Sequence, residues 1–205
     1  METTKITNYD FEKIFDNEKS IFFIQIGANN GVTVDPINNL VKTKKNWRGV
    51  LFEPGVEAFE QLKITYKDYN NLTLVNCAVS NFDGKTILYC GETSPHFTLD
   101  KTKAIHMFNI TPNEVEVEVM SPKTIISKFD ITHVDLLQID TEGRDFTIIK
   151  SFIENNILPD VIRFEYVNLS YENTDGLKVI NYLSDFGYES FYVENEGDII
   201  SILKK

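Results

Sequence analysis

Short apolar runs that end at glycine or at an acidic residue alternate along this chain with segments of helical periodicity. The clearest run, Ile21–Ile26, is almost wholly apolar and ends at Gly27. A continuous apolar run of this length predicts a strand that is buried on both faces, as in a parallel sheet. The same reasoning predicts further strands at 50–53, 72–75, 134–139 and 161–165, and helices at 8–17, 35–45, 56–69, 121–129, 144–155 and 175–186. Strands that alternate with helices predict an α/β fold with a doubly wound, mostly parallel sheet.

Two regions depart from this alternation. Valine alternates with glutamate over 115–119, which together with 86–90 predicts a small inserted antiparallel pair. Residues 91–114 follow no regular pattern, and long irregular connections of this kind are usually functional. At the end of the chain, 188–193 and 199–203 predict an antiparallel hairpin that closes the sheet. Because no linker or repeat interrupts the chain, we expect residues 1–205 to form a single domain.

The first strand runs into the loop Gly27-Ala28-Asn29-Asn30-Gly31, followed by Asp35-Pro36 at the expected start of a helix. The two glycines allow a tight turn and a close approach of a ligand. A strand, a glycine loop and a helix start together predict a nucleotide-binding unit. The loop lacks the middle glycine of a dinucleotide-binding fingerprint, and no G-K-[ST] of a P-loop follows it.

Composition narrows the class of partner. The chain has 205 residues, 42% of them hydrophobic, which suits one well-buried core. A net charge of −11 argues against a nucleic-acid partner. No apolar stretch is long enough to span a membrane and the N-terminus has no apolar leader, so we expect a cytoplasmic protein without a membrane span. Cys77 and Cys90 form no C-x-x-C pair and are expected to be core thiols.

The residues after each predicted strand are the candidates for chemistry, because ligands bind beyond the carboxyl ends of parallel strands. Glu53 follows the glycine loop by about 20 residues, a spacing at which an acid accepts both hydroxyls of a ribose. Its alternative role is to cap the helix that follows Pro54-Gly55. Ala78 and Val79 suit the edge of an adenine, and equally suit ordinary loop packing. Asp140, Glu142 and Glu165 follow the last two core strands.

Five stretches, in this order, resemble the FkbM family of class I S-adenosylmethionine-dependent methyltransferases. They are residues 23–33, 47–54, 76–80, 134–143 and 163–165, of which Ile139-Asp140-Thr141-Glu142-Gly143 is the most specific. The resemblance implies a Rossmann-like sheet of the seven-stranded type and S-adenosylmethionine as the cofactor.

The resemblance also implies roles for single residues. Gly27, Asn29 and Gly31 would line the cofactor loop, with Glu53 on the ribose. Asp140 and Glu142 would face the reacting end of the cofactor. The family usually carries acids at the positions of Gln25 and Asn30, and the first of them helps to hold the cofactor's ammonium group. This chain has amides at both positions, so Asp140 is expected to take over that charge.

The implied reaction is the attack of an acceptor oxygen on the sulfonium methyl group, which requires alignment and removal of a proton. The carboxylates of Asp140, Glu142 and Glu165 are hard ligands of the kind that hold Mg²⁺ or Mn²⁺. Alternatively, Glu142 favours a helix dipole and Glu165 pairs with Arg163 or Arg144. His96 and His106, both in the irregular segment, are alternative bases.

We therefore expect an O-methyltransferase that acts on a hydroxyl of a sugar, another small metabolite or a glycoconjugate. Two alternatives stay open. An NAD-dependent oxidoreductase shares the strand, loop and helix and an acid at Glu53, and a degenerate cofactor-binding module is consistent with the two amides. The sequence carries no pattern that identifies the acceptor or the oligomeric state.

Overall fold

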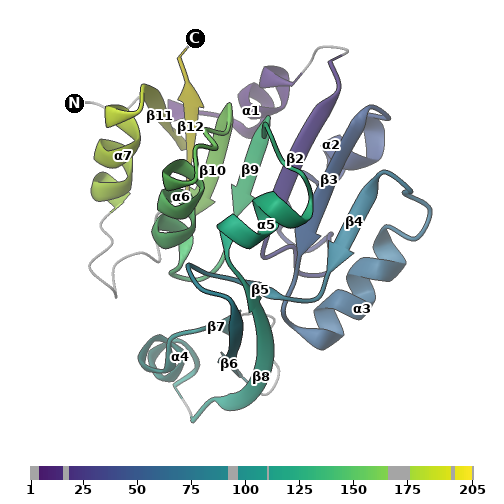
Figure 1. Ribbon diagram of the computed structural model, residues 1–205, viewed down its shortest axis with the longest axis vertical. Helices are drawn as coiled ribbons and strands as arrows, with labels where there is room; N and C mark the ends of the chain where they lie inside the picture. Colours follow the sequence, from purple (N-terminus) through teal and green to yellow (C-terminus); the bar gives the residue numbers. More distant parts are fainter. Residues whose placement is uncertain are drawn as a thin grey trace.

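In this computed structural model, residues 5–15, 19–91, 97–109, 111–165, 176–194 and 197–204 are described. They form a large sheet covered by helices on both faces, with a smaller sheet and one helix beside it (Figure 1). None of the helices in these ranges is long and apolar enough to cross a membrane.

The large sheet has eight strands in the order β1-β11-β12-β10-β9-β2-β3-β4. Its neighbours from β10 to β4 are parallel, whereas β12 is antiparallel to both β10 and β11. This confirms the predicted doubly wound sheet with its C-terminal antiparallel hairpin, and β1 adds a short edge strand beside β11. The bounds are β1 Lys5–Ile6, β2 Ile21–Ile26, β3 Trp47–Phe52, β4 Leu72–Val75, β9 Leu136–Ile139, β10 Val161–Glu165, β11 Tyr188–Val193 and β12 Asp198–Leu203.

The core lies in two layers because the side chains of each strand alternate between the faces of the sheet. On one face, Ile24 and Ile26 of β2 join a cluster with residues of α5, α6 and α7. On the other face, Ile21 and Phe23 join a cluster with α1, α2 and α3. The helices are α1 Asn8–Ile14, α2 Asn38–Thr43, α3 Val56–Thr65, α5 Pro122–Lys128, α6 Asp145–Glu154 and α7 Gly176–Asp185.

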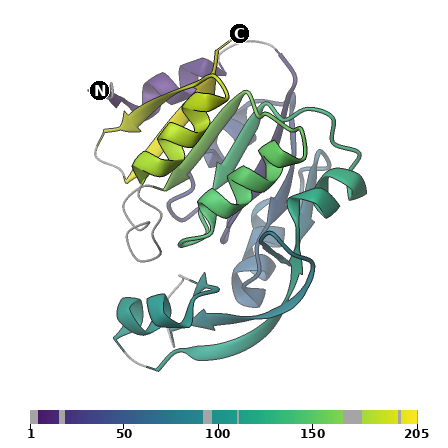
Figure 2. The same ribbon diagram turned by 60° about the vertical axis from the view of Figure 1, so that its left-hand side comes forward.

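The smaller sheet is inserted between β4 and β9 and has the order β5-β8-β6-β7. Strands β6 and β8 pair antiparallel, with Ile87 opposite Glu116, as the valine–glutamate alternation predicts. The bounds are β5 Ala78–Val79, β6 Gly84–Cys90, β7 Phe97–Thr98, α4 Lys101–Phe108 and β8 Asn113–Met120. Figure 2 shows this insert as a separate layer below the large sheet.

One local expectation is wrong. The segment 91–114, expected to be irregular, contains β7 and the helix α4, whose Ala104 is fully buried. The helix expected over 35–45 is shorter and spans Asn38–Thr43. Asp35 Oδ1 accepts hydrogen bonds from the backbone N–H groups of Ile37 and Asn38, which are the contacts expected of an N-cap residue before Pro36.

Candidate cofactor and active site

A pocket of about 830 Å³ lies at the carboxyl ends of the parallel strands. The strand order reverses at this point, since β3 and β4 lie on one side of β2 while β9 and β10 lie on the other. Ligands of doubly wound sheets bind at such a switch point, and the volume suits a small molecule or a cofactor. The lining includes, among the residues singled out in the sequence, Gln25, Gly27, Asn29, Glu53, Ala78, Val79, Asp140, Glu142 and Glu165.

The glycine loop packs closely against other parts of the protein. Gly27 and Gly31 have φ values of +80° and +70°, a region that favours glycine. A Cβ atom on Gly27 would overlap the carbonyl oxygen of Asp140 and lie 2.9 Å from its carbonyl carbon. A Cβ atom on Gly31 would lie 2.6 Å from Tyr66 and 2.8 Å from Leu62. The positive φ values agree with the tight turn predicted from the sequence, and the protein itself limits the space at both glycines.

The two asparagines of this loop differ in their contacts. The backbone N–H of Asn29 donates to the Glu53 carboxylate at 2.8 Å, and its side chain accepts from the Asn30 N–H at 2.7 Å. Asn30 Oδ1 accepts from the N–H groups of Val32 and Thr33 at 2.9 and 2.8 Å. Neither Asn30 nor Gly31 is among the described residues that line the pocket. The Asn30 side chain thus stabilises the turn.

Glu53 joins the glycine loop to the start of α3. One carboxylate oxygen accepts from Asn29 N–H, and the other accepts from the N–H of Gly55, the residue that precedes α3, at 2.7 Å. The side chain is buried, and burial raises the pKa of Glu53 to about 7 against the opposite effect of the two N–H donors. Glu53 therefore contacts the residue that precedes α3 and also lines the pocket, where a ribose role is open to it.

A row of buried polar side chains forms part of the pocket lining on the α1–α2 face of the sheet. Gln25 on β2 lies opposite Gln138 on β9, which lies opposite Arg163 on β10. All three are at least 96% buried, and Arg163 Nε donates to Asp198 at 2.7 Å. The pocket lining also includes Asp35. Apart from Gln25, none of these residues is proposed as a site residue from the sequence, although a polar residue within a buried apolar strand is a usable signal.

The acidic loop after β9 holds several carboxylates close together. Asp140 is accessible from the pocket, yet the surrounding protein desolvates it and raises its pKa well above the ordinary value. The neighbouring carboxylates, chiefly Asp145, Glu165 and Glu142, raise it further. Potential ligand atoms of Asp140, Glu142 and Glu165 all lie within 4.8 Å of one another. This arrangement favours either a protonated carboxyl or a bound cation.

Asp145 holds the acidic loop in place. This buried carboxylate accepts hydrogen bonds from both the N–H and the hydroxyl of Thr141, and its other oxygen accepts from the Glu165 N–H at 3.2 Å. Glu142 has a φ of +54°, an uncommon conformation for a residue other than glycine. The loop between β9 and α6 is thereby tied to the end of β10.

The insert supplies the opposite wall of the pocket. Ala78 and Val79 of β5 line it together with Leu88 and Thr98, and the Thr98 hydroxyl donates to the Glu142 carbonyl at 3.2 Å. This contact joins the insert to the acidic loop.

The other reactive side chains of the sequence take different positions. His96 lies outside the described residues. His106 is exposed on α4, and among the described residues it is not part of the pocket lining. Cys77 does line the pocket, but burial raises the pKa of its thiol to about 11, so the thiolate is scarce at neutral pH.

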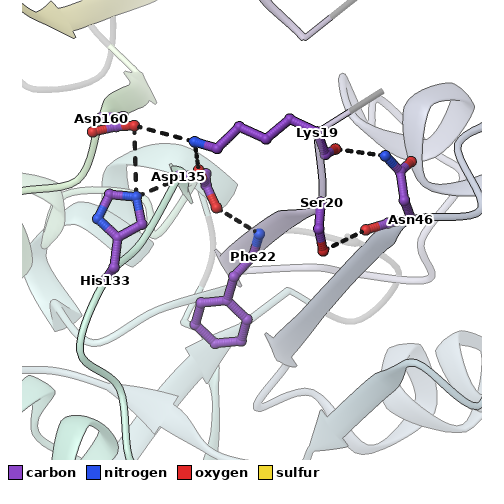
Figure 3. Close-up of polar contacts among 7 residues, drawn as sticks. All are labelled: Lys19, Ser20, Phe22, Asn46, His133, Asp135 and Asp160. Atoms are coloured by element: carbon purple, nitrogen blue, oxygen red, sulfur yellow. Dashed lines mark hydrogen bonds and ion pairs between the residues drawn. The ribbon is translucent and has the colours of Figure 1, made fainter. Parts of the chain in front are cut away.

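A second group of potential metal ligands lies at the amino ends of β9 and β10 (Figure 3). His133 Nε2 is 3.4 Å from Asp135 Oδ1 and 3.5 Å from Asp160 Oδ2. Lys19 Nζ lies 2.6 Å from the same Asp135 oxygen, and Asp135 Oδ2 accepts from the Phe22 N–H at 2.8 Å. Because the Lys19 ammonium lies 2.6 Å from Asp135 and 3.9 Å from Asp160, we interpret the group as a brace that joins the start of β2 to the starts of β9 and β10.

Known structures share this architecture. Precorrin-6y C5,15-methyltransferase from Geobacter metallireducens GS-15 superposes with a TM-score of 0.51 at 14% identity, covering 99% of this chain and 95% of that one. A methyltransferase from Geobacter sulfurreducens gives a TM-score of 0.53 at 12% identity, covering 96% and 76%. At these identities the likeness concerns the fold alone. No curated protein matched the sequence.

The family of this chain is shown by a match to its sequence. The model of the methyltransferase FkbM domain matches residues 25–190, which contain the glycine loop, Glu53 and the acidic loop. This span is most of the chain and confirms the resemblance drawn from the five short stretches. The chain belongs to the FkbM family of S-adenosylmethionine-dependent methyltransferases.

Proposed function

We propose that residues 1–205 act as one methyltransferase domain that transfers a methyl group from S-adenosylmethionine to a hydroxyl of a sugar, another small metabolite or a glycoconjugate. The observation that carries this proposal is the meeting of the glycine loop, Glu53 and the acidic loop in one pocket. Their hydrogen bonds and close packing bring together the residues that we assign to the ribose and to acid–base chemistry.

The cofactor's nucleoside would lie between Glu53 and the insert. Each carboxylate oxygen of Glu53 accepts one backbone hydrogen bond and keeps a lone pair for a ribose hydroxyl. Hydroxyl donors favour the ionised carboxylate and would lower the raised pKa of Glu53 on binding. Ala78 and Val79 offer the small apolar surface that an adenine edge requires.

Asp140 is the residue we propose as the base. The acceptor oxygen forms a bond to the methyl carbon while the bond from that carbon to sulfur breaks, and the hydroxyl proton passes to the Asp140 carboxylate. A carboxylate with a raised pKa is a stronger base than an ordinary one, and its location in the pocket brings it within reach of an acceptor. Glu142 and Glu165 lie beside it. Of the other sequence candidates for this role, His106 is exposed and is not among the described residues of the pocket lining, and His96 lies outside the described residues.

A divalent ion is a further part of the proposal. Asp140 and Glu165, with Glu142, present hard oxygen ligands whose potential ligand atoms lie within 4.8 Å of one another, close enough to share one Mg²⁺ or Mn²⁺. Such an ion would lower the pKa of a bound hydroxyl.

A thermal melt tests the cofactor assignment. S-adenosylhomocysteine at about 100 times its dissociation constant should add about 2.7 kcal/mol to the free energy of unfolding and raise the midpoint by several degrees. NAD should give no shift. A shift with NAD alone would instead favour the oxidoreductase, and binding of S-adenosylhomocysteine without methyl transfer to any hydroxylated acceptor would favour the non-catalytic module. A cytoplasmic location, consistent with the free thiols of Cys77 and Cys90, belongs to the same proposal.

A further inference from the structure

The polar row in the pocket lining contains more hydrogen-bond acceptors than the protein satisfies. Three buried oxygen atoms have no hydrogen-bond partner among the described residues: Gln25 Oε1, Gln138 Oε1 and Asp35 Oδ2. Leaving such a buried group unsatisfied is costly, and native proteins rarely leave several together. All three residues line the same pocket. The surplus of acceptors therefore indicates a ligand group that is rich in donors.

The charges around this row favour a cation. Arg163 is balanced by the Asp198 carboxylate at 2.7 Å, so the positive charge of the row already has a counter-ion. Asp35 adds a further carboxylate. Its Oδ1 accepts from the N–H groups of Ile37 and Asn38 at 2.9 and 3.1 Å. Its other oxygen, Oδ2, has no hydrogen-bond partner among the described residues. A primary ammonium carries three N–H donors and one positive charge, and so matches three acceptors and one carboxylate.

Asp35 lies in different surroundings from Asp140. Burial raises the pKa of Asp35, whereas two backbone N–H groups, the Gln25 amide and Arg163 act in the opposite direction. Asp35 is therefore surrounded by hydrogen-bond donors and a guanidinium, and its carboxylate lies beside Gln25. Asp140 lies among the carboxylates of the acidic loop, with Glu142 and Glu165 close by.

We propose that Asp35, with the side-chain carbonyls of Gln25 and Gln138, binds the ammonium group at the amino-acid end of S-adenosylmethionine. This inference rests on the proposed function, and it assigns to Asp35 the charge that the amide of Gln25 lacks. The three oxygens are buried in the ligand-free protein, although their residues line the pocket. A side-chain amide turns about its last torsion at low cost, so a small rearrangement would bring them into contact with an entering donor.

The test compares two ligands that differ only at the amino-acid end. S-adenosylhomocysteine carries the ammonium, whereas 5′-methylthioadenosine keeps the adenosine and the thioether without it. By isothermal titration calorimetry, Asp35→Asn should weaken the binding of S-adenosylhomocysteine about 10- to 100-fold and leave that of 5′-methylthioadenosine unchanged. The asparagine keeps an oxygen for the N–H groups of Ile37 and Asn38, so the turn should persist.

Two further variants test this interpretation. Asp130→Asn removes the same charge from an exposed position outside the pocket lining and should change neither affinity. Gln138→Met removes an unsatisfied acceptor at similar volume, so it should weaken S-adenosylhomocysteine binding without lowering the melting temperature of the ligand-free protein.

The outcomes separate the two proposals. Equal weakening of both ligands by Asp35→Asn, or no weakening of either, would overturn the ammonium site while the cofactor assignment stands. A wild-type protein that binds neither ligand would overturn the proposed function and this inference with it.

Discussion

Replacing Gly27 with alanine tests the contact between the glycine loop and the acidic loop. At a φ of +80°, an alanine costs about 1–2 kcal/mol in backbone conformation alone. Its Cβ would also overlap the Asp140 carbonyl, which belongs to the backbone and cannot rotate away as a side chain would. Overpacking of this kind costs about 1–3 kcal/mol more. We therefore expect Gly27→Ala to lower the free energy of unfolding by about 2–5 kcal/mol, a large part of the roughly 5–15 kcal/mol of a typical domain.

Gly187 provides a matched control. Its φ of +88° is close to that of Gly27, but the nearest atom to its Cβ position is Leu203 Cδ1 at 3.9 Å. Gly187→Ala should therefore show the conformational cost without the overlap. Urea denaturation of both variants measures the difference, with the midpoint shifting and the slope unchanged. Because the overlap displaces Asp140, Gly27→Ala should also lose S-adenosylhomocysteine binding while Gly187→Ala keeps it. Equal destabilisation by the two variants would show that the contact with Asp140 does not restrict residue 27.

Three further predictions concern the charged groups. Burial raises the pKa of Glu53 from an ordinary 4.5 to about 7, so its contribution to stability is present at low pH and is lost as pH rises through about 7. The free energy of unfolding of Glu53→Gln should therefore rise by on the order of 3 kcal/mol relative to that of the wild type between about pH 4.5 and 7. Parallel urea titrations that showed no such relative gain would refute this prediction. Asp140→Asn should lower the rate of methyl transfer by orders of magnitude, while it removes repulsion between neighbouring carboxylates and leaves the fold intact. A chelator added to the wild type then shows whether an ion takes part. An active, chelator-insensitive variant would contradict the role of this loop. Asp135→Asn should lower the free energy of unfolding by about 1–3 kcal/mol, because the buried carboxylate accepts hydrogen bonds from the Phe22 N–H and Lys19. Lys19→Met, at a half-exposed side chain, should lower it by less than about 1 kcal/mol. The reverse order in urea denaturation would contradict the brace.

The sequence predicts the strands better than the contacts between them. The bounds of β2, β4 and β10 match the expected ranges, because each is a short apolar run enclosed by turn-forming or charged residues. The pairing of β6 with β8 follows from alternation with one exposed face. Helix α4 is missed because its eight residues are too few to establish a clear helical period, and tertiary packing of the buried Ala104 stabilises it.

The residues of the candidate site can be predicted only in part from the sequence, for a related reason. The residues that directly follow the strands can be found one at a time, as Glu53 and Asp140 were. The polar row cannot, because it depends on the register that places Gln25, Gln138 and Arg163 side by side on three strands that are far apart in the chain. Asp35 shows the same limit, since the sequence suggests only a helix start there.

The way in which the insert is attached bears on how this fold can change in evolution. Its two ends meet where Ala78 and Val79 pair with Val119 and Met120, and Asp83 at its first turn accepts hydrogen bonds from the Ser121 N–H and hydroxyl. Insertions or exchanges between these anchor points would leave the strand order and the cofactor side of the pocket untouched. One wall of the pocket can therefore diversify while the other is conserved, so that relatives could acquire new acceptors by exchanging this one segment.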